Sequence, residues 1–168
     1  MSEPRVNIDR AKIFEKTQAA SIEALNVSLI SSGRLLRAKL SHPGKGRIYR
    51  VAKGGKTGAR NLRAAGFHRA SAPGDPPAVN TNRLRASWSV ARLGVSLDSF
   101  AVISASKRAT ILTFGSNVPY AQILEVGGTT GRGRRSRIAS RPYIKPTMPA
   151  IAKLVPQVFD MAFRKAFK

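Results

Sequence analysis

Hydrophobic side chains recur at helical spacing through the first forty residues of the chain. We expect one long helix from about Asn7 to Leu40, with Asn7 or Asp9 as its cap and His42-Pro43-Gly44 as its end. Gly33 is a weak point at which this helix could bend or break. The apolar positions that fall near one face of the helix are Ile22, Leu25, Leu29, Leu36 and Leu40.

The middle of the chain changes to the period-two alternation that is typical of strands. β-Branched and aromatic residues recur there near every second position. Because three of the segments follow one another closely, they predict an antiparallel sheet. The strands are expected at 47–51, 88–95, 99–105 and 110–115.

Short helices and a terminal helix complete the predicted fold. A capped helical turn is expected at 80–87, a short helix at 119–126, and an amphipathic helix at 146–167 that Pro156 could interrupt. The proline-rich segment 72–77 predicts an extended, stiff connector. The fold class is therefore α+β: a long N-terminal helix, a central antiparallel β-sheet with short helices, and a C-terminal helix. Residues 1–168 fit a single domain.

The net charge of the chain is unusual for a globular protein, whereas its content of hydrophobic residues is ordinary. Lys and Arg total 30 against 8 Asp and Glu, which gives a formal net charge of +22. Such a surplus favours a polyanionic partner, either nucleic acid or an acidic protein surface. No stretch approaches the ~20 apolar residues of a membrane span, and the N-terminus has no apolar leader. We therefore expect a cytosolic protein without a membrane partner.

Two glycine-rich segments concentrate the positive charge. We expect mobile basic loops at about 53–66 and 127–140. The first begins with a stretch rich in Gly and Lys, and the second is mostly Gly and Arg, with almost nothing apolar to bury in exchange for its ordering entropy. Their cations are candidate contacts to a partner or to DNA. The candidate contact residues, with one neighbouring arginine, are Lys53, Lys56, Arg60, Arg132, Arg134, Arg135, Arg137 and Arg141.

The chain is poor in residues that support catalysis or metal binding. It has no cysteine and two histidines, His42 and His68, with few carboxylates in the middle of the chain, so we expect no metal site. The string GGKT at 54–57 is not a phosphate-binding loop, because Arg50 stands where that loop needs its first glycine. No carboxylate pair is recognisable by spacing. We expect neither an enzyme nor a cofactor.

Two single residues have more than one interpretation. Glu125 is either a solvated residue at a helix C-terminus or one half of an ion pair, with Arg141 or with an arginine of the next subunit. Trp88 either packs in the core or stacks on a nucleic-acid base. Core packing is favoured, because no aromatic residues interleave with the basic runs.

Three phrases, in a fixed order, resemble a family of phage proteins. They are ASAPGDPPAVNT at 70–81, VPYAQILEVGGT at 118–129 and SRPYIKP at 140–146. They are similar to the phrases APGEPP…TG.L..S, YA..LE.GT and RPF..PA of the small tail-completion or head-tail joining proteins of siphophages. Asn82 stands where that family usually has glycine. The expected layout of helices and sheet also resembles that family.

The resemblance implies a structural virion protein of the phage neck or tail end, assembled in the host cytoplasm. Its expected role is to complete the tail and to help join it to the DNA-filled head. The implied partners are further copies of the chain, in a ring of six, together with the tail terminator, the tail tube and the head-closure protein. Terminator, completion factor and head-side stopper all remain open. The alternative is a nonspecific nucleic-acid-binding basic protein.

The arginines of the 127–140 segment have two candidate partners, which are the DNA that passes through the neck and an acidic protein surface. DNA must slide during ejection, and a ring of arginines would hold its phosphates at many points. Guanidinium groups also form paired hydrogen bonds with carboxylates. We therefore favour an acidic surface of an adjacent ring.

Overall fold

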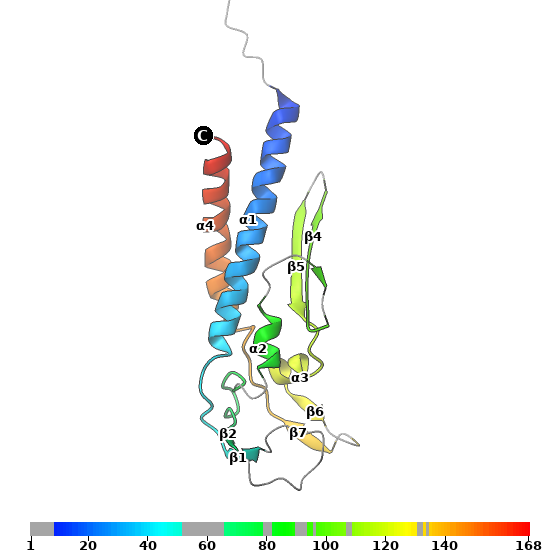
Figure 1. Ribbon diagram of the computed structural model, residues 1–168, viewed down its shortest axis with the longest axis vertical. Coiled ribbons are helices and arrows are strands. Elements are labelled where there is room, and N and C mark those ends of the chain that lie inside the picture. The colour runs from blue at the N-terminus through cyan, green and yellow to red at the C-terminus, as the bar shows by residue number, and fades with distance from the viewer. Residues whose placement is uncertain are drawn as a thin grey trace, which may run out of the picture.

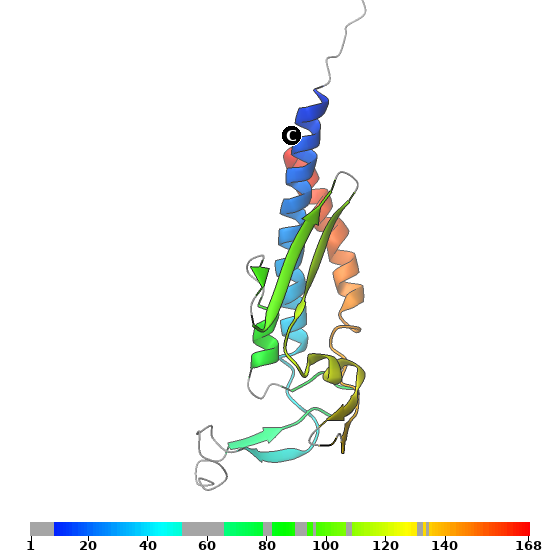
Figure 2. The same cartoon turned by 90° about the vertical axis from the view of Figure 1, so that its right-hand side faces the viewer.

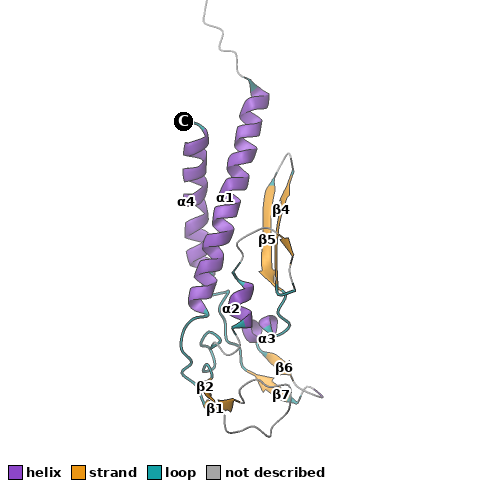
Figure 3. Ribbon diagram, in the orientation of Figure 1, coloured by secondary structure: helices purple, strands orange, loops and turns teal. Residues whose placement is uncertain are grey.

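The computed structural model describes residues 9–51, 66–78, 82–89, 94–95, 97–106, 109–130, 133 and 135–168. Figures 1 and 3 show a long body of helices and a sheet, with two small hairpins at one end. This is the α+β fold that the sequence predicts. In chain order the elements are α1 (Arg10–Lys39), β1 (Ile48–Val51), β2 (Gly66–Arg69), α2 (Arg83–Ser87), β3 (Gly94–Val95), β4 (Ser99–Ala105), β5 (Thr110–Ser116), α3 (Ala121–Val126), β6 (Gly128–Thr130), β7 (Ser136–Ile138) and α4 (Met148–Ala166).

The body consists of α1, α2, α4 and the sheet formed by β3, β4 and β5. Helices α1 and α4 run side by side along its length (Figures 1 and 2), and Ala24 of α1 is buried with Val158 and Ala162 of α4. The start of α1 confirms one predicted cap, because the Lys12 amide donates a hydrogen bond to Asp9 Oδ1 at 3.1 Å.

Neither predicted weak point interrupts a helix. α1 continues through Gly33, which is buried, so packing along the helix outweighs a local cost of about 1 kcal/mol. α4 continues through Pro156, which lacks the N–H that would bond the carbonyl of Ala152. Both Pro156 and Ala152 are exposed, so water can bind that carbonyl instead.

The central sheet has the strand order β3-β4-β5, and its pairs are antiparallel. β4 and β5 pair over their whole length, which confirms both predicted strands. One face of the sheet packs on α1, where Leu29 and Ala101 are buried together beside Leu112 and Phe114. Because side chains alternate along a strand, the residues between these positions point away from α1.

The predicted strand at 88–95 is wrong at its start and confirmed at its end. The chain stays helical to Ser87 and Trp88 follows as the C-cap, whereas Gly94 and Val95 form β3; residues 90–93 lie outside the described part. Trp88 is 4% exposed, and its ring meets Phe114 and Tyr143 edge-on at 6.1 Å each. Burial of this ring favours the helical turn over a strand, and the predicted core role of Trp88 is confirmed.

The predicted loop at 127–140 is also wrong in its described flanks. β6 pairs with β7, with Thr129 opposite Arg137. Backbone hydrogen bonds between the two strands therefore stabilise a segment that has few apolar side chains to bury. Gly127, at φ +79°, lets this hairpin pass close to the next segment, because a Cβ there would lie 3.0 Å from Ser140 N. The other predicted loop, 53–66, lies outside the described residues except for Gly66.

Candidate functional site

Three segments that are distant in sequence meet at the base of the body. The Gly74 amide donates to the Ser140 carbonyl at 2.9 Å, and the Arg141 amide donates to the Leu124 carbonyl at 2.7 Å. We call this contact the junction; it joins segment 70–78, the α3 segment 118–128 and segment 140–147. The predicted connector at 72–77 is free of helix, as expected, and has a turn at Pro73 and Gly74.

The carboxylate of Glu125 is the centre of the junction. Its Oε2 accepts hydrogen bonds from the amides of Tyr143 at 2.8 Å and Ile144 at 3.0 Å. Its Oε1 accepts a third from the amide of Lys145 at 2.9 Å. These amides lie just before α4, where N–H groups have no helical partner and a negative charge is favoured. Glu125 thus ties the end of α3 to the beginning of α4.

This role differs from both interpretations of Glu125 that the sequence offered. The side chain is neither simply solvated nor paired with Arg141, whose Nε is buried without a hydrogen-bond partner among the described residues. The amides of its own chain already engage both carboxylate oxygens. The inter-subunit ion pair concerns a second chain and stays a prediction.

Tyr143 fixes the junction to the hydrophobic core. Its side chain is fully buried and packs with Trp88, Leu84 and Val118. The Tyr143 hydroxyl has no hydrogen-bond partner among the described residues. Burial, followed by the negative charge of Glu125, raises the pKa of Tyr143 to about 12. The phenol is therefore neutral at ordinary pH, and it anchors the junction by packing.

Two hairpins project beyond the junction, at the end of the molecule opposite the start of α1 (Figures 1 and 2). The hairpins are β1–β2 and β6–β7, and we call residues 44–71 and 127–141, which contain them, the basic end. These 43 residues hold thirteen Lys and Arg and no Asp or Glu. The basic end therefore contributes thirteen of the 22 net positive charges from about a quarter of the chain.

The structure places some of the predicted contact residues on this end. Arg135 and Arg137 are exposed on the β6–β7 hairpin, two positions apart, whereas Arg141 is half-buried at the junction. Two further exposed cations of the basic end, Lys45 and Arg69, were not among the predicted contact residues. Arg69 lies on β2, which pairs with β1. The remaining predicted contacts, Lys53, Lys56, Arg60, Arg132 and Arg134, lie outside the described residues.

Three ion pairs among the described residues join side chains of the body. Arg83 pairs with Asp98, with Nε at 2.9 Å from Oδ1, and this guanidinium holds the pKa of Asp98 below its usual value. The other pairs are Arg164 with Asp160 and Lys165 with Glu23. Within the described part of the basic end, Lys45, Arg69, Arg135 and Arg137 make no ion pair.

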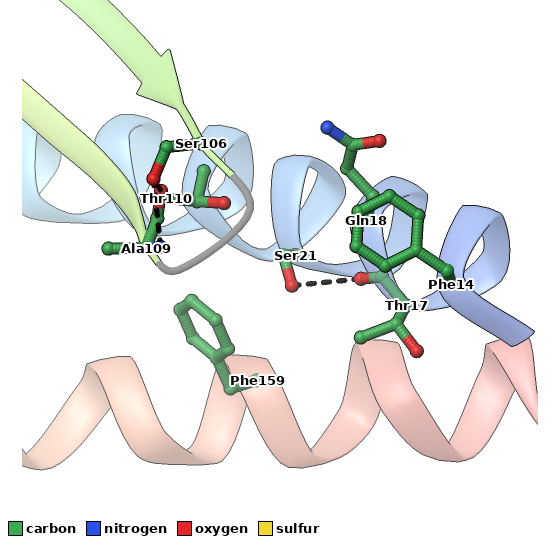
Figure 4. A pocket seen from close by; sticks show the side chains of 8 residues that line it. All are labelled: Phe14, Thr17, Gln18, Ser21, Ser106, Ala109, Thr110 and Phe159. Carbon is green, nitrogen blue, oxygen red and sulfur yellow. Dashed lines mark hydrogen bonds between the residues drawn. The ribbon is translucent and has the colours of Figure 1, made fainter.

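A small cavity at the other end of the body has no comparable chemistry. It has a volume of about 240 Å³ and lies between the first half of α1, α4 and the β4–β5 turn (Figure 4). Its lining includes Phe14, Phe159, Thr17, Ser21 and Gln18, and none of the described residues that line it has a titratable side chain. We therefore find no acid or base positioned there for catalysis.

The described residues contain neither a metal-binding cluster nor a membrane span. No group of three or more His, Cys, Asp or Glu residues is placed to hold a metal ion there. None of the helices described is long and apolar enough to cross a membrane. Comparison with protein-family models, curated proteins and solved structures found no significant match.

Proposed function

We propose that this chain is a structural protein of the neck or tail end of a long-tailed bacteriophage. It completes the tail and helps join it to the DNA-filled head, acting by binding and not by catalysis. The observation that carries the proposal is the junction. The three phrases that resemble the tail-completion family, at 70–81, 118–129 and 140–146, lie in direct contact there through Gly74, Glu125 and Arg141.

Asn82 adds a second, local support. In the family this position usually carries glycine, and here Asn82 has φ +62°, the left-handed region that glycine favours and asparagine tolerates. Among the described residues it is the non-glycine residue with a positive φ. The backbone geometry therefore explains why glycine and asparagine would replace each other at this position.

The basic end supplies the surface for docking. Arg135 and Arg137 are exposed and make no ion pair with described residues, so a carboxylate-rich surface of an adjacent neck component can pair with both. The proposed partners are the tail terminator, the tail tube or the head-closure protein. Copies of the chain form a ring, with six as the expected number, in the virion after assembly in the host cytoplasm.

A phage that lacks this gene tests the proposal. We expect filled heads and separate tails that fail to join, and purified protein added to such an extract should restore infectious particles. Arg135→Gln with Arg137→Gln should restore joining poorly, whereas Lys12→Gln with Lys16→Gln, which removes two exposed cations from α1, should restore it normally. A null phage that fails to package DNA or to build capsids would contradict the assignment.

A nonspecific nucleic-acid-binding protein is the second candidate, and the thirteen cations of the basic end favour it. In that case the purified chain should bind short duplex DNA tightly, with an affinity that falls steeply as salt rises. The same double substitution, Arg135→Gln with Arg137→Gln, should then weaken DNA binding and leave docking to purified tails unchanged. Weak DNA binding with strong tail docking would instead support the neck protein.

A further inference from the structure

The outer face of strands β4 and β5 carries no charged residue; Lys107 and Arg108, in the turn between the strands, lie outside the described residues. Neither strand, Ser99–Ala105 nor Thr110–Ser116, contains a charged residue, although 23% of the chain is charged. On the face that points away from α1, Val102 is 48% exposed and Ile111 is 57% exposed. Their cross-strand neighbours there, Thr113 and Ser104, are also neutral.

The far part of this face is flattened by an aromatic ring. Phe100 lies opposite Gly115, and a Cβ at Gly115 would lie 2.6 Å from that ring. The glycine therefore lets the ring lie directly on the strand. Phe100, Val102 and Ile111 lie on this same face and together form a neutral, partly apolar strip along β4 and β5.

β5 also has an unprotected edge. It is the last strand in the order β3-β4-β5, and no other described strand pairs with its second side. Edge strands are usually protected by a lysine, a proline or a bulge. β5 has the sequence TILTFGS and an unbroken register with β4, so it has none of these. Its free backbone groups can therefore accept another strand.

We propose that this neutral strip and the β5 edge together form the contact with a second copy of the chain. This proposal rests on the ring of copies in the proposed function and adds the surface through which neighbouring copies touch. The geometry that supports it is that of β4 and β5 alone. A strand of the neighbouring copy continues the sheet at β5. The strip of Val102 and Ile111 is buried against the same neighbour.

Charge selects a second copy over another partner. Every copy carries a net charge of +22, so two copies repel each other wherever their cations face each other. An acidic partner gains most from the basic end and gains no electrostatic attraction from a neutral face. Strands β4 and β5 contain no charged residue, so copies can approach each other at this face with little repulsion.

This contact has a distinctive salt dependence. Added salt shortens the range of electrostatic interactions from about 10 Å at 0.1 M to a few ångströms at 1 M, and it screens the repulsion between copies. Self-association through the neutral face should therefore strengthen as salt rises. A contact made through Arg135 and Arg137 to an acidic surface should weaken under the same change.

Sedimentation of the purified full chain at low and high salt tests the contact. We expect Ile111→Lys to weaken self-association at least about tenfold, because it places an unpaired positive charge in a neutral, partly apolar interface. Met161→Lys is the matched control: it adds one lysine at a position on α4 that is 61% exposed, and it should change the association less than about twofold. Thr113→Lys adds a lysine on the same outer face, opposite Val102, and should weaken self-association in the same way. Circular dichroism checks that each variant folds.

Several outcomes would overturn the proposal. It fails if both Ile111→Lys and Thr113→Lys associate like the parent chain, or if association weakens as salt rises. It also fails if the chain stays monomeric at every salt concentration while Ile111→Lys still abolishes head-tail joining, because the face then binds a different protein. Self-association through the strip by a chain that does not restore joining would contradict the neck assignment and leave this contact standing.

Discussion

The body and the basic end hold their charges in opposite ways. In the body, Arg83, Arg164 and Lys165 each have a carboxylate partner, and the helices bury leucine and alanine side chains between them. In the basic end, Lys45, Arg69, Arg135 and Arg137 have no such partner among the described residues. Its hairpins are held by backbone hydrogen bonds and by the junction at Glu125.

The difference indicates that stability and binding are located in different parts of the molecule. A buried aromatic cluster gains free energy from every apolar contact, whereas exposed and unpaired arginines contribute little to folding. Unpaired cations remain available to a partner. Substitutions in the body should therefore change the free energy of unfolding, and substitutions in the basic end should change binding.

The largest expected effect is on the core of the body. Trp88→Ala should lower the free energy of unfolding by about 3–5 kcal/mol, because it removes a buried ring that packs on Phe114 and Tyr143. Urea denaturation followed by circular dichroism measures this change. Leu97→Ala, at a residue that is 93% exposed, should stay within about 0.5 kcal/mol and serves as the control.

The second-largest effect on the free energy of unfolding is expected at the junction. Glu125→Ala removes three hydrogen bonds to backbone amides and should destabilise the protein by about 1–3 kcal/mol, a range lowered by the partial exposure of the side chain. Hydrogen exchange should become faster at the amides of Tyr143, Ile144 and Lys145. Glu15→Ala, at an exposed glutamate of α1, should change neither quantity; equal effects of the two variants would contradict the role of Glu125.

A smaller effect is expected from the hydroxyl of Tyr143. Because the pKa of Tyr143 in the folded protein is about 12, above its usual value of 10.0, the folded state disfavours the charged phenolate. Stability should be complete below pH 10 and should fall as the pH rises from about 10 to about 12, where the unfolded chain loses this proton first. Tyr143→Phe should remove that part of the fall; an unchanged pH profile in the variant would exclude Tyr143 as its source.

The smallest effect on stability is expected in the basic end. Arg135→Gln with Arg137→Gln should change the free energy of unfolding by less than about 0.5 kcal/mol, because neither side chain has an ion pair among the described residues. The same variant should bind poly-glutamate less tightly at low salt than the parent chain does. A large loss of stability would show that these arginines support the fold.

Much of the candidate site was beyond prediction from the sequence. The positive charge of the basic end, and Arg135 and Arg137 within it, are visible in the residue order alone. The hydrogen bonds of Glu125 are not, because its amide partners lie 18 to 20 positions further along the chain. A carboxylate followed at a distance by a proline-flanked helix start is the only signal in the sequence that could have indicated it.

The sequence by itself determined the elements that depend on local periodicity. α1 and α4 repeat apolar positions at helical spacing, and β4 and β5 are rich in β-branched and aromatic residues, so the sequence locates each of these elements. Which face of β4 and β5 packs on α1 was decided by the tertiary structure, because both faces carry apolar residues. Only the tertiary structure decided the helical turn at Trp88, the β6–β7 hairpin and the junction. Their geometry is set by contacts between distant segments, and no local pattern encodes which buried ring or which backbone amide a residue will meet.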